Sequence, residues 1–419
     1  TGVQTCALPI LIYSDHFEEN ETAIRYYNQI MVICQENNVM DVELLALINL
    51  ANCHSDMFDY EDALKYFSVV LEKSKNMEFE SYIFYIYNYL SYVSLKMGNN
   101  KEAYKYYLLA QRELEQYPVQ GKYISVHYQM GAELYYVIGN IDVAYDLIKK
   151  ALKIYNNDGT KQDNNSKLLL FILQIQRAEN IDDINKNIQN TNTIINSYKS
   201  KMNKVNALYE ICIAMYEKGY VDEASNLFKL HPFNKEDILV EMVNIKRLYL
   251  EGLICIGKKK IEVLMLALEL SKKVKNKFFQ WRICSCIGDY YLTEQDYFYA
   301  VNYYFEACEI IKDCTMQLPE LLRINYMNAC NMMKPFNMIK GISKTYEYSK
   351  ICNLEEGKIT ISTNEDLITL FNYGEFAEIL NNKSFIESAQ KIYSAILPEG
   401  IHNINDIITN MCEDPLQIL

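Results

Sequence analysis

The sequence predicts an all-α protein built as a solenoid of stacked helix pairs, and three observations support this prediction. Apolar residues recur at helical spacing along most of the 419 residues. Only 14 glycines and 7 prolines are present, too few for the turns of an all-β or α/β chain of this length. A pattern of small and aromatic residues also returns about every 40 residues. A repeat array therefore explains the length better than two or three separate globular domains do.

The repeat is clearest in the second helix of each unit, where a small residue is followed four positions later by an aromatic or large apolar one. The stretches "DYEDALKYF", "GNNKEAYKYY", "GNIDVAYDLI" and "KGYVDEASNLF" carry it. Successive positions are about 40 residues apart, with one double step. The positions in this register are Ala23, Ala63, Ala103, Ala144, Ala224, Leu264, Ala300 and Gly341.

A second series of small residues lies twelve positions earlier, in the first helix of each unit. Small side chains let two helix axes approach closely, so each unit is expected to be helix A, a short turn and helix B, crossing at the two small residues. In one unit we expect Gly131 and Ala132 to face Ala144, with Gly139 and Asn140 forming the turn. The series is Ala51, Ser91, Ala132, Cys212, Gly252, Gly288 and Ala329.

This pattern resembles the tetratricopeptide repeat (TPR). The stretch "WRICSCIGDYYLTEQDYFYAVNYYFEACEI" carries Trp281, Gly288, Tyr291, Ala300 and Tyr304 at the matching spacing. The resemblance covers about residues 15 to 350 and implies a right-handed α-α superhelical solenoid of about eight to ten helix pairs. Two features differ from the family: the prolines at the unit ends are absent, and the period is near 40 instead of 34, which lengthens each helix by about 4.5 Å.

The chain divides into five expected segments. The opening "TGVQTCALPI" lacks a starting methionine and does not continue into helical periodicity, "NNDGTKQDNN" is the clearest insertion, and terminal repeats are usually atypical. The segments are a non-native leader or truncated end (1–12), an N-terminal sub-array (13–158), a loop and degenerate helix pair acting as a hinge (159–203), a C-terminal sub-array (204–352), and an atypical helix pair with a C-terminal cap (353–419).

Composition excludes several classes of function. A net charge of −13 argues against a nucleic-acid surface, and it favours a cytoplasmic protein with apolar, neutral or basic partners. The most apolar stretch, 81–98, contains Asn88 and Lys96, so a buried helix is expected there and not a membrane span. The twelve cysteines include no CxxC pair and the five histidines no HxxxH pair; reduced buried thiols and no metal site are expected.

No catalytic motif is present. The sequence contains no phosphate-binding GxxxxGK[ST], no GxGxxG after a strand, no GxSxG and no kinase signature, so we expect neither a cofactor nor catalytic residues. An enzyme is accordingly the least favoured alternative.

The expected functional surface is the concave groove lined by helix A of every unit. Asn and Gln can donate to and accept from a peptide backbone, Tyr adds contact area at low entropic cost, and Arg can pair with a carboxylate. The predicted groove residues are Asn49, Asn52, Tyr85, Asn88, Tyr92, Gln129, Glu133, Tyr136, Tyr209, Tyr216, Lys246, Tyr249, Arg282, Asp289, Arg323 and Tyr326.

The long units, the low-G+C composition and the acidic array also resemble the peptide-sensing regulators of Gram-positive bacteria (the RRNPP group). That resemblance implies a short peptide as ligand and an N-terminal helix-turn-helix domain or three-helix bundle that delivers the output. Two main hypotheses stay open: a scaffold for a peptide or protein segment, and the sensory part of a regulator whose DNA-binding domain lies upstream of this sequence. Neither nucleic acid nor membrane is expected as a direct partner, and a homodimer is left open.

Overall fold

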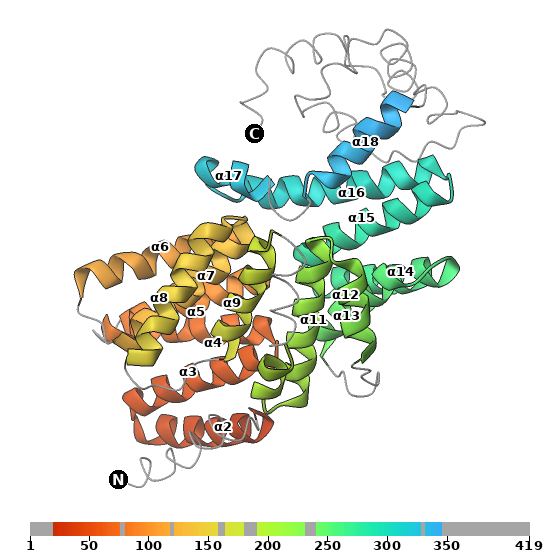
Figure 1. Cartoon of the computed structure of the whole chain (residues 1–419). Coiled ribbons are helices and arrows are strands. Elements are labelled where there is room, and N and C mark those ends of the chain that lie inside the picture. The colour runs from red at the N-terminus through yellow and green to blue at the C-terminus, as the bar shows by residue number, and fades with distance from the viewer. Residues whose placement is uncertain are drawn as a thin grey trace, which may run out of the picture.

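The computed structural model describes residues 20–75, 80–117, 121–157, 164–179, 191–230, 240–327 and 332–345. Within these ranges every regular element is a helix, and the helices stack in consecutive antiparallel pairs (Figure 1). The predicted all-α solenoid is therefore confirmed. The expectations for residues 1–12 and 353–419 lie outside the described residues.

The first half of the chain begins with a B helix and then alternates A and B. Its A helices are α3, α5, α7 and α9, and their facing B helices are α4, α6 and α8. The bounds are α2 (Asn20–Asn37), α3 (Met40–Asp56), α4 (Tyr60–Lys75), α5 (Glu80–Lys96), α6 (Asn100–Gln116), α7 (Gly121–Ile138), α8 (Ile141–Asn157) and α9 (Asn164–Arg177).

The second half continues the alternation after a short helical stretch at 191–197. Hydrogen bonds join its first A helix to α9: Gln176 Nε2 donates to the carbonyl of Ala214 at 3.1 Å, and Lys218 Nζ donates to the carbonyl of Gln176 at 2.7 Å. The bounds are α11 (Lys201–Glu217), α12 (Val221–Leu230), α13 (Glu241–Ile254), α14 (Lys258–Lys273), α15 (Lys277–Thr293), α16 (Tyr297–Met316), α17 (Glu320–Met327) and α18 (Lys334–Thr345).

Among the described residues, every predicted crossing position except Gly341 is buried. Ala63, Ala103 and Ala300 are fully excluded from solvent. A Cβ placed on Gly288 of α15 would lie 2.6 Å from Cε1 of Tyr304 on the facing helix α16, so only glycine fits there. The small residues thus do what the repeat predicts: they let the two helices of a unit approach closely.

Two details of the predicted register are wrong. A Cβ on Gly131 would lie 2.7 Å from the hydroxyl oxygen of Tyr107, so this glycine makes room for α6 of the preceding unit and not for Ala144 on α8. Gly341 is exposed, and a Cβ there would meet no atom within 4 Å. The helix α18 instead buries Phe336 and Ile339, which lie on a different face from Gly341. The repeat register therefore does not extend to this unit.

Four of the described turns between helices A and B, those before α4, α6, α8 and α16, share one geometry. A residue with positive φ ends helix A, for example Gly98 (φ 77°) and Gly139 (φ 86°). The next residue caps helix B: Asn99 accepts from the backbone N–H of Glu102, and Asn140 accepts from that of Val143. The predicted turn at Gly139 and Asn140 is confirmed, with the positive φ confined to the glycine.

The apolar stretch 81–98 forms α5, which is packed inside the array. Its residues Phe84, Leu90 and Val93 are buried in a core shared with α3, α4 and α6. No helix among the described residues is both long and apolar enough to cross a membrane. The described cysteines are free thiols, all buried except Cys255, which is partly exposed.

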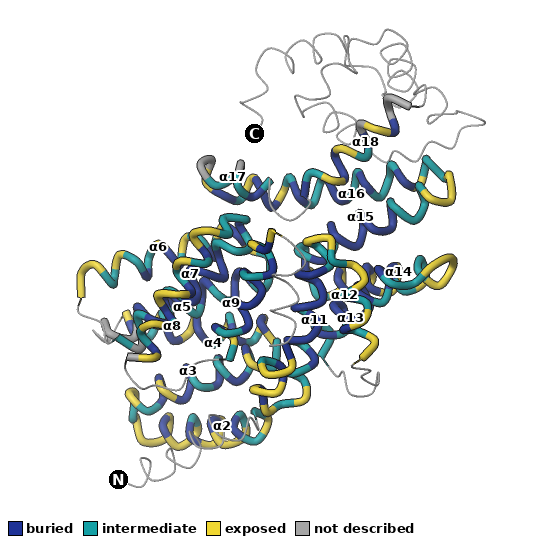
Figure 2. The backbone as a smooth tube through the Cα atoms, in the orientation of Figure 1, coloured by how far each residue is buried: buried dark blue, intermediate teal, exposed yellow. Residues whose placement is uncertain are grey.

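The helices α2–α8 and α11–α18, the two sub-arrays expected from the sequence, also touch across the superhelix. The turn between α5 and α6 meets the start of α15, and α17 contacts α7. The side chains of Asn100 and Tyr326, both buried, are hydrogen-bonded to each other. We call this contact between the α5–α6 turn and the helices α15 and α17 the seam. Figure 2 shows the result: α11 and α15 are buried over most of their length, whereas α2 exposes its outer side.

Candidate binding face inside the superhelix

The sixteen predicted groove residues all lie on the A helices, and none of them is exposed. Because the A helices of the two sub-arrays face a common interior, these side chains contact neighbouring helices as well as each other. Buried are Asn88, Gln129, Glu133, Tyr209, Lys246, Tyr249, Arg282 and Tyr326. Half-buried are Asn49, Asn52, Tyr85, Tyr92, Tyr136, Tyr216, Asp289 and Arg323.

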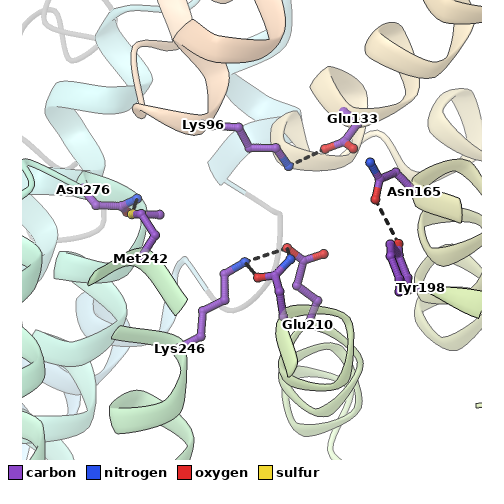
Figure 3. Close-up of polar contacts among 9 residues, drawn as sticks. Lys96, Glu133, Asn165, Tyr198, Glu210, Met242, Lys246 and Asn276 are labelled. Atoms are coloured by element: carbon purple, nitrogen blue, oxygen red, sulfur yellow. Dashed lines mark hydrogen bonds and ion pairs between the residues drawn. The ribbon is translucent and has the colours of Figure 1, made fainter. Parts of the chain in front are cut away.

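Two ion pairs occupy the middle of this face. Lys96 at the end of α5 donates to Glu133 of α7 at 2.6 Å. Lys246 of α13 donates to Glu210 of α11 at 2.6 Å, and to the side-chain oxygen of Asn206 at the same distance. Figure 3 shows the two ammonium groups pointing from opposite sides towards one central region. These five residues, with the neighbouring Tyr60 and Tyr92, form what we call the central cluster.

Electrostatics couple the two sides of the central cluster. Burial alone would lower the pKa of Lys96, but the carboxylates of Glu133 and Glu210 outweigh it, and the pKa is raised. Burial would raise the pKa of Glu210, but Lys246 and Lys96 outweigh it, and the pKa is lowered. Lys96 and Glu210 are therefore both charged near neutral pH. They belong to different sub-arrays, and each stabilises the charged form of the other.

The two tyrosines of the central cluster remain protonated. Burial raises the pKa of Tyr60 and Tyr92 above the usual phenol value. Their rings lie edge to face with centroids 6.5 Å apart, and the ammonium of Lys96 lies 5.0 Å from the ring centroid of Tyr92. The cluster thus offers neutral hydroxyl groups beside its four charges.

The N-terminal end of the face has an unused acceptor. Asn52 donates through Nδ2 to the hydroxyl of Tyr85 at 2.9 Å, while its buried Oδ1 has no hydrogen-bond partner. The ring of Tyr85 packs against that of Tyr89 with centroids 4.4 Å apart, and burial raises the pKa of Tyr85 to about 12. An orphaned carbonyl oxygen costs about 1 to 3 kcal/mol, which a donor on a ligand would relieve.

Asn88 is placed differently from the groove prediction. It is fully buried, its Nδ2 donates to the carbonyl of Phe84 at 2.8 Å, and its Oδ1 lies 2.8 Å from Nδ1 of His127. The ring of His127 stacks on Tyr107, with centroids 4.7 Å apart, and burial lowers the pKa of His127 to about 4. Asn88 therefore belongs to the packing between α5 and α7.

Arg282 has a carboxylate partner, but the partner is internal. Its Nε donates to Glu217 of α11 at 2.7 Å, and the side chains are only 3% and 7% exposed. Its guanidinium lies 3.7 Å from the ring centroid of Phe278. The sequence pattern indicated that Arg282 could bind a carboxylate. In the structure that carboxylate is Glu217, which lies two units earlier in the array.

The remaining C-terminal groove residues are also engaged within the fold. Asp289 accepts from the hydroxyl of Tyr304 at 2.8 Å and from Lys334 at 2.5 Å. Arg323 donates to the carbonyl of Leu318 at 3.0 Å. The central cluster is therefore the part of the face where charges from both sub-arrays come together.

Four members of the central cluster were not predicted: Tyr60, Lys96, Asn206 and Glu210. One signal was available, since Asn206 occupies in its unit the same register as Lys246 in the next, six residues before the small residue. Lys96 and Glu210 lie outside the expected groove positions. They reach the interior only because the two sub-arrays curl towards each other.

A separate group, His54, Asp59 and Asp62, has ligand atoms close enough together to hold a metal ion. Contacts within the turn already account for it. His54 Nδ1 lies 3.0 Å from Asp59, which also accepts from the backbone N–H of Asp62 at the start of α4. The ring of His54 stacks on Tyr66. The group is a helix cap with a hydrogen bond between His54 and Asp59, and it gives no second indication of a metal.

Comparison with known proteins informs the fold. No protein-family model matches the sequence, and no curated protein matches it. Among solved structures, the chain is similar to a Rap protein complexed with competence and sporulation factor, with a TM-score of 0.50 and 14% sequence identity; the match covers 84% of this chain and 99% of that chain. The fold is a TPR-like superhelical repeat. At this identity the likeness concerns the fold alone, and the assignment of a ligand rests on the residues described above.

Proposed function

We propose that this protein is a non-catalytic scaffold that binds a short peptide or an extended partner segment along its inward-facing A helices. The observation that carries the proposal is the central cluster, where A helices from both sub-arrays bring Lys96, Glu133, Glu210 and Lys246 to one region. A peptide backbone offers donors and acceptors along its whole length. A face of Tyr, Asn, Lys and Glu side chains matches that chemistry.

Two further observations support it. The fold is shared with a Rap protein complexed with competence and sporulation factor, which supports a binding role for a chain with this fold. Asn52 also keeps a buried acceptor without a partner at the N-terminal end of the same face. An extended ligand that reaches from Asn52 to the central cluster would donate a hydrogen bond to Asn52 Oδ1 and also contact the charges of the cluster.

Peptide selection provides a direct test. Heptapeptides selected from a random library against the protein should bind the wild type, and Asn52→Ala and Tyr92→Ala should each weaken them about tenfold, the effect of one lost hydrogen bond or aromatic contact. Glu262→Ala, on the exposed side of α14, is the matched control and should bind as the wild type does. Unchanged affinity in both inner-face variants would place the ligand elsewhere, and failure to select any peptide would reject the proposal.

A finer proposal makes the chain the sensory part of a regulator. A ligand at the central cluster would contact both sub-arrays. If it binds one relative arrangement of the sub-arrays more tightly than another, it shifts the equilibrium towards that arrangement. The seam is the contact that such a shift would break or strengthen. Hydrogen exchange of α15 and α17 with and without a selected peptide tests this, and exchange rates that do not change on binding would contradict a sensory role.

A further inference from the structure

The two ion pairs of the central cluster are asymmetric in a complementary way. In the first pair Glu133 is the more buried side chain, 12% exposed against 25% for Lys96. In the second pair Lys246 is the more buried one, 10% exposed against 28% for Glu210. The side chains that keep more exposure are therefore Lys96 on the N-terminal sub-array and Glu210 on the C-terminal sub-array.

Lys96 and Glu210 do not form an ion pair with each other, although each is close enough to affect the other's ionisation. Each is held in place by its own partner, Glu133 or Lys246. Figure 3 shows Lys96 and Glu210 on opposite sides of the same central region. Two fixed, opposite charges that face one region form a dipolar site.

A dipolar site selects for charge pattern more than for net charge. A ligand carboxylate placed at Lys96 and a ligand ammonium placed at Glu210 would each gain a charge-assisted hydrogen bond. A ligand with only one charge would displace water from the other protein charge without giving it a new contact, which is unfavourable. The hydroxyls of Tyr60 and Tyr92 remain protonated and can donate to the same carboxylate.

We propose that the central cluster recognises a zwitterionic group: a carboxylate and an ammonium close together on a short peptide, the carboxylate at Lys96 and the ammonium at Glu210. This rests on the peptide-binding function proposed above and specifies its ligand. Two sources supply the chemistry. One is an acidic side chain next to a basic one, and the other is a chain terminus next to a side chain of opposite charge.

The test uses two synthetic heptapeptide libraries of random sequence, one with acetylated and amidated ends and one with free ends. Bound peptides are identified by mass spectrometry. Enrichment of adjacent opposite charges in the blocked library identifies side chains as the source. Enrichment only in the free library, with the charged residue beside a terminus, identifies the terminus. In either case we expect enriched peptides to bind about tenfold or more tighter than versions with Asn and Gln in place of the charged residues.

Single variants separate recognition from folding. Lys96→Met should abolish selection for the carboxylate and retain selection for the ammonium, while Glu210→Gln should do the reverse. Loss of structure would instead abolish both. Lys272→Met is the matched control, because Lys272 forms an ion pair of the same 2.6 Å length with Glu306 away from the cluster, and its selection profile should equal that of the wild type. Thermal unfolding of each variant confirms that the fold is retained.

The outcomes distinguish the two proposals. If peptides are selected and Asn52→Ala weakens them, but adjacent opposite charges are not enriched, the zwitterion proposal is overturned while the peptide-binding function stands. The same holds if Lys96→Met and Glu210→Gln leave the charge profile unchanged. If neither library yields a binder, the peptide-binding function itself fails.

Discussion

The Cβ position of Gly98, in the turn between α5 and α6, lies 3.7 Å from Cβ of Lys277 at the start of α15. These residues belong to different sub-arrays and are far apart in the chain. Their contact, together with the hydrogen bond between Asn100 and Tyr326, closes the superhelix on itself. The inward face, including the central cluster, is therefore bordered by a seam.

This distance permits a disulfide, because Cβ atoms in disulfides are typically 3.5 to 4.5 Å apart. We expect Gly98→Cys combined with Lys277→Cys to form a crosslink under oxidising conditions, detectable in proteolytic fragments by mass spectrometry. If ligand enters through the seam, the crosslinked protein should bind selected peptides at least about tenfold more slowly, and reduction should restore the rate.

The single variants are the controls for the crosslink. Gly98→Cys alone tests the strain of a side chain at φ 77°, and Lys277→Cys alone tests loss of the ion pair with Asp313. A crosslink that forms and leaves the association rate unchanged would show that ligand does not enter through the seam. Absence of the crosslink would show that the seam is open in solution.

Glycine at position 288 is expected to be required by packing. In Gly288→Ala the new methyl group would lie 2.6 Å from Cε1 of the fully buried Tyr304, and overpacking of this kind lowers the free energy of unfolding by about 1 to 3 kcal/mol. Gly341→Ala is the matched control, since nothing lies within 4 Å, and it should gain up to about 1 kcal/mol from helix propensity. Urea unfolding measures both, and equal effects would contradict the packing argument.

The ion pair between Arg282 and Glu217 is expected to matter because it is buried. Replacing Glu217 with Gln removes the carboxylate that accepts from Arg282 Nε, and loss of one charge of a buried pair costs about 3 to 5 kcal/mol. Lys65→Met removes one partner of an exposed pair with Asp62 and should cost no more than about 1 kcal/mol. Chemical denaturation compares the two variants, and similar losses would mean that Glu217 is solvated in solution.

His127 should make stability depend on pH. Its pKa is lowered to about 4 in the fold by burial, against about 6.5 in the unfolded chain, so below pH 6.5 the unfolded state takes up a proton that the folded state does not. The stability that the fold gains by keeping His127 neutral is fully present above pH 6.5 and is lost as the pH falls towards 4. At pH 5 the loss is about 2 kcal/mol.

The measurement is the free energy of unfolding at pH 7 and pH 5 for the wild type and His127→Gln. Between pH 7 and pH 5 the free energy of unfolding should fall by about 2 kcal/mol less in the variant than in the wild type, because glutamine does not titrate in this range. A decrease of the same size in both proteins would show that His127 is not the group responsible.

The local pattern of the sequence determined the helix pairs and their crossing points. Ala63, Ala103 and Ala300 are buried where the small-residue series placed them, because close helix approach depends on residues within one unit. The positive φ at Gly139 and the cap at Asn140 follow from the same short-range signals. The predicted groove residues all lie on A helices, although Asn88 is packed between α5 and α7, and their role in binding stays a proposal.

Only the tertiary structure decided which residues meet between units. The pairing of Arg282 with Glu217, the space that Gly131 leaves for Tyr107, and the approach of Lys96 to Glu210 all join separate units or sub-arrays. The departure of Gly341 from the register likewise appears only in the packed array. The physical reason is that small rotations between consecutive repeats accumulate along a solenoid, and no short stretch of sequence encodes their sum.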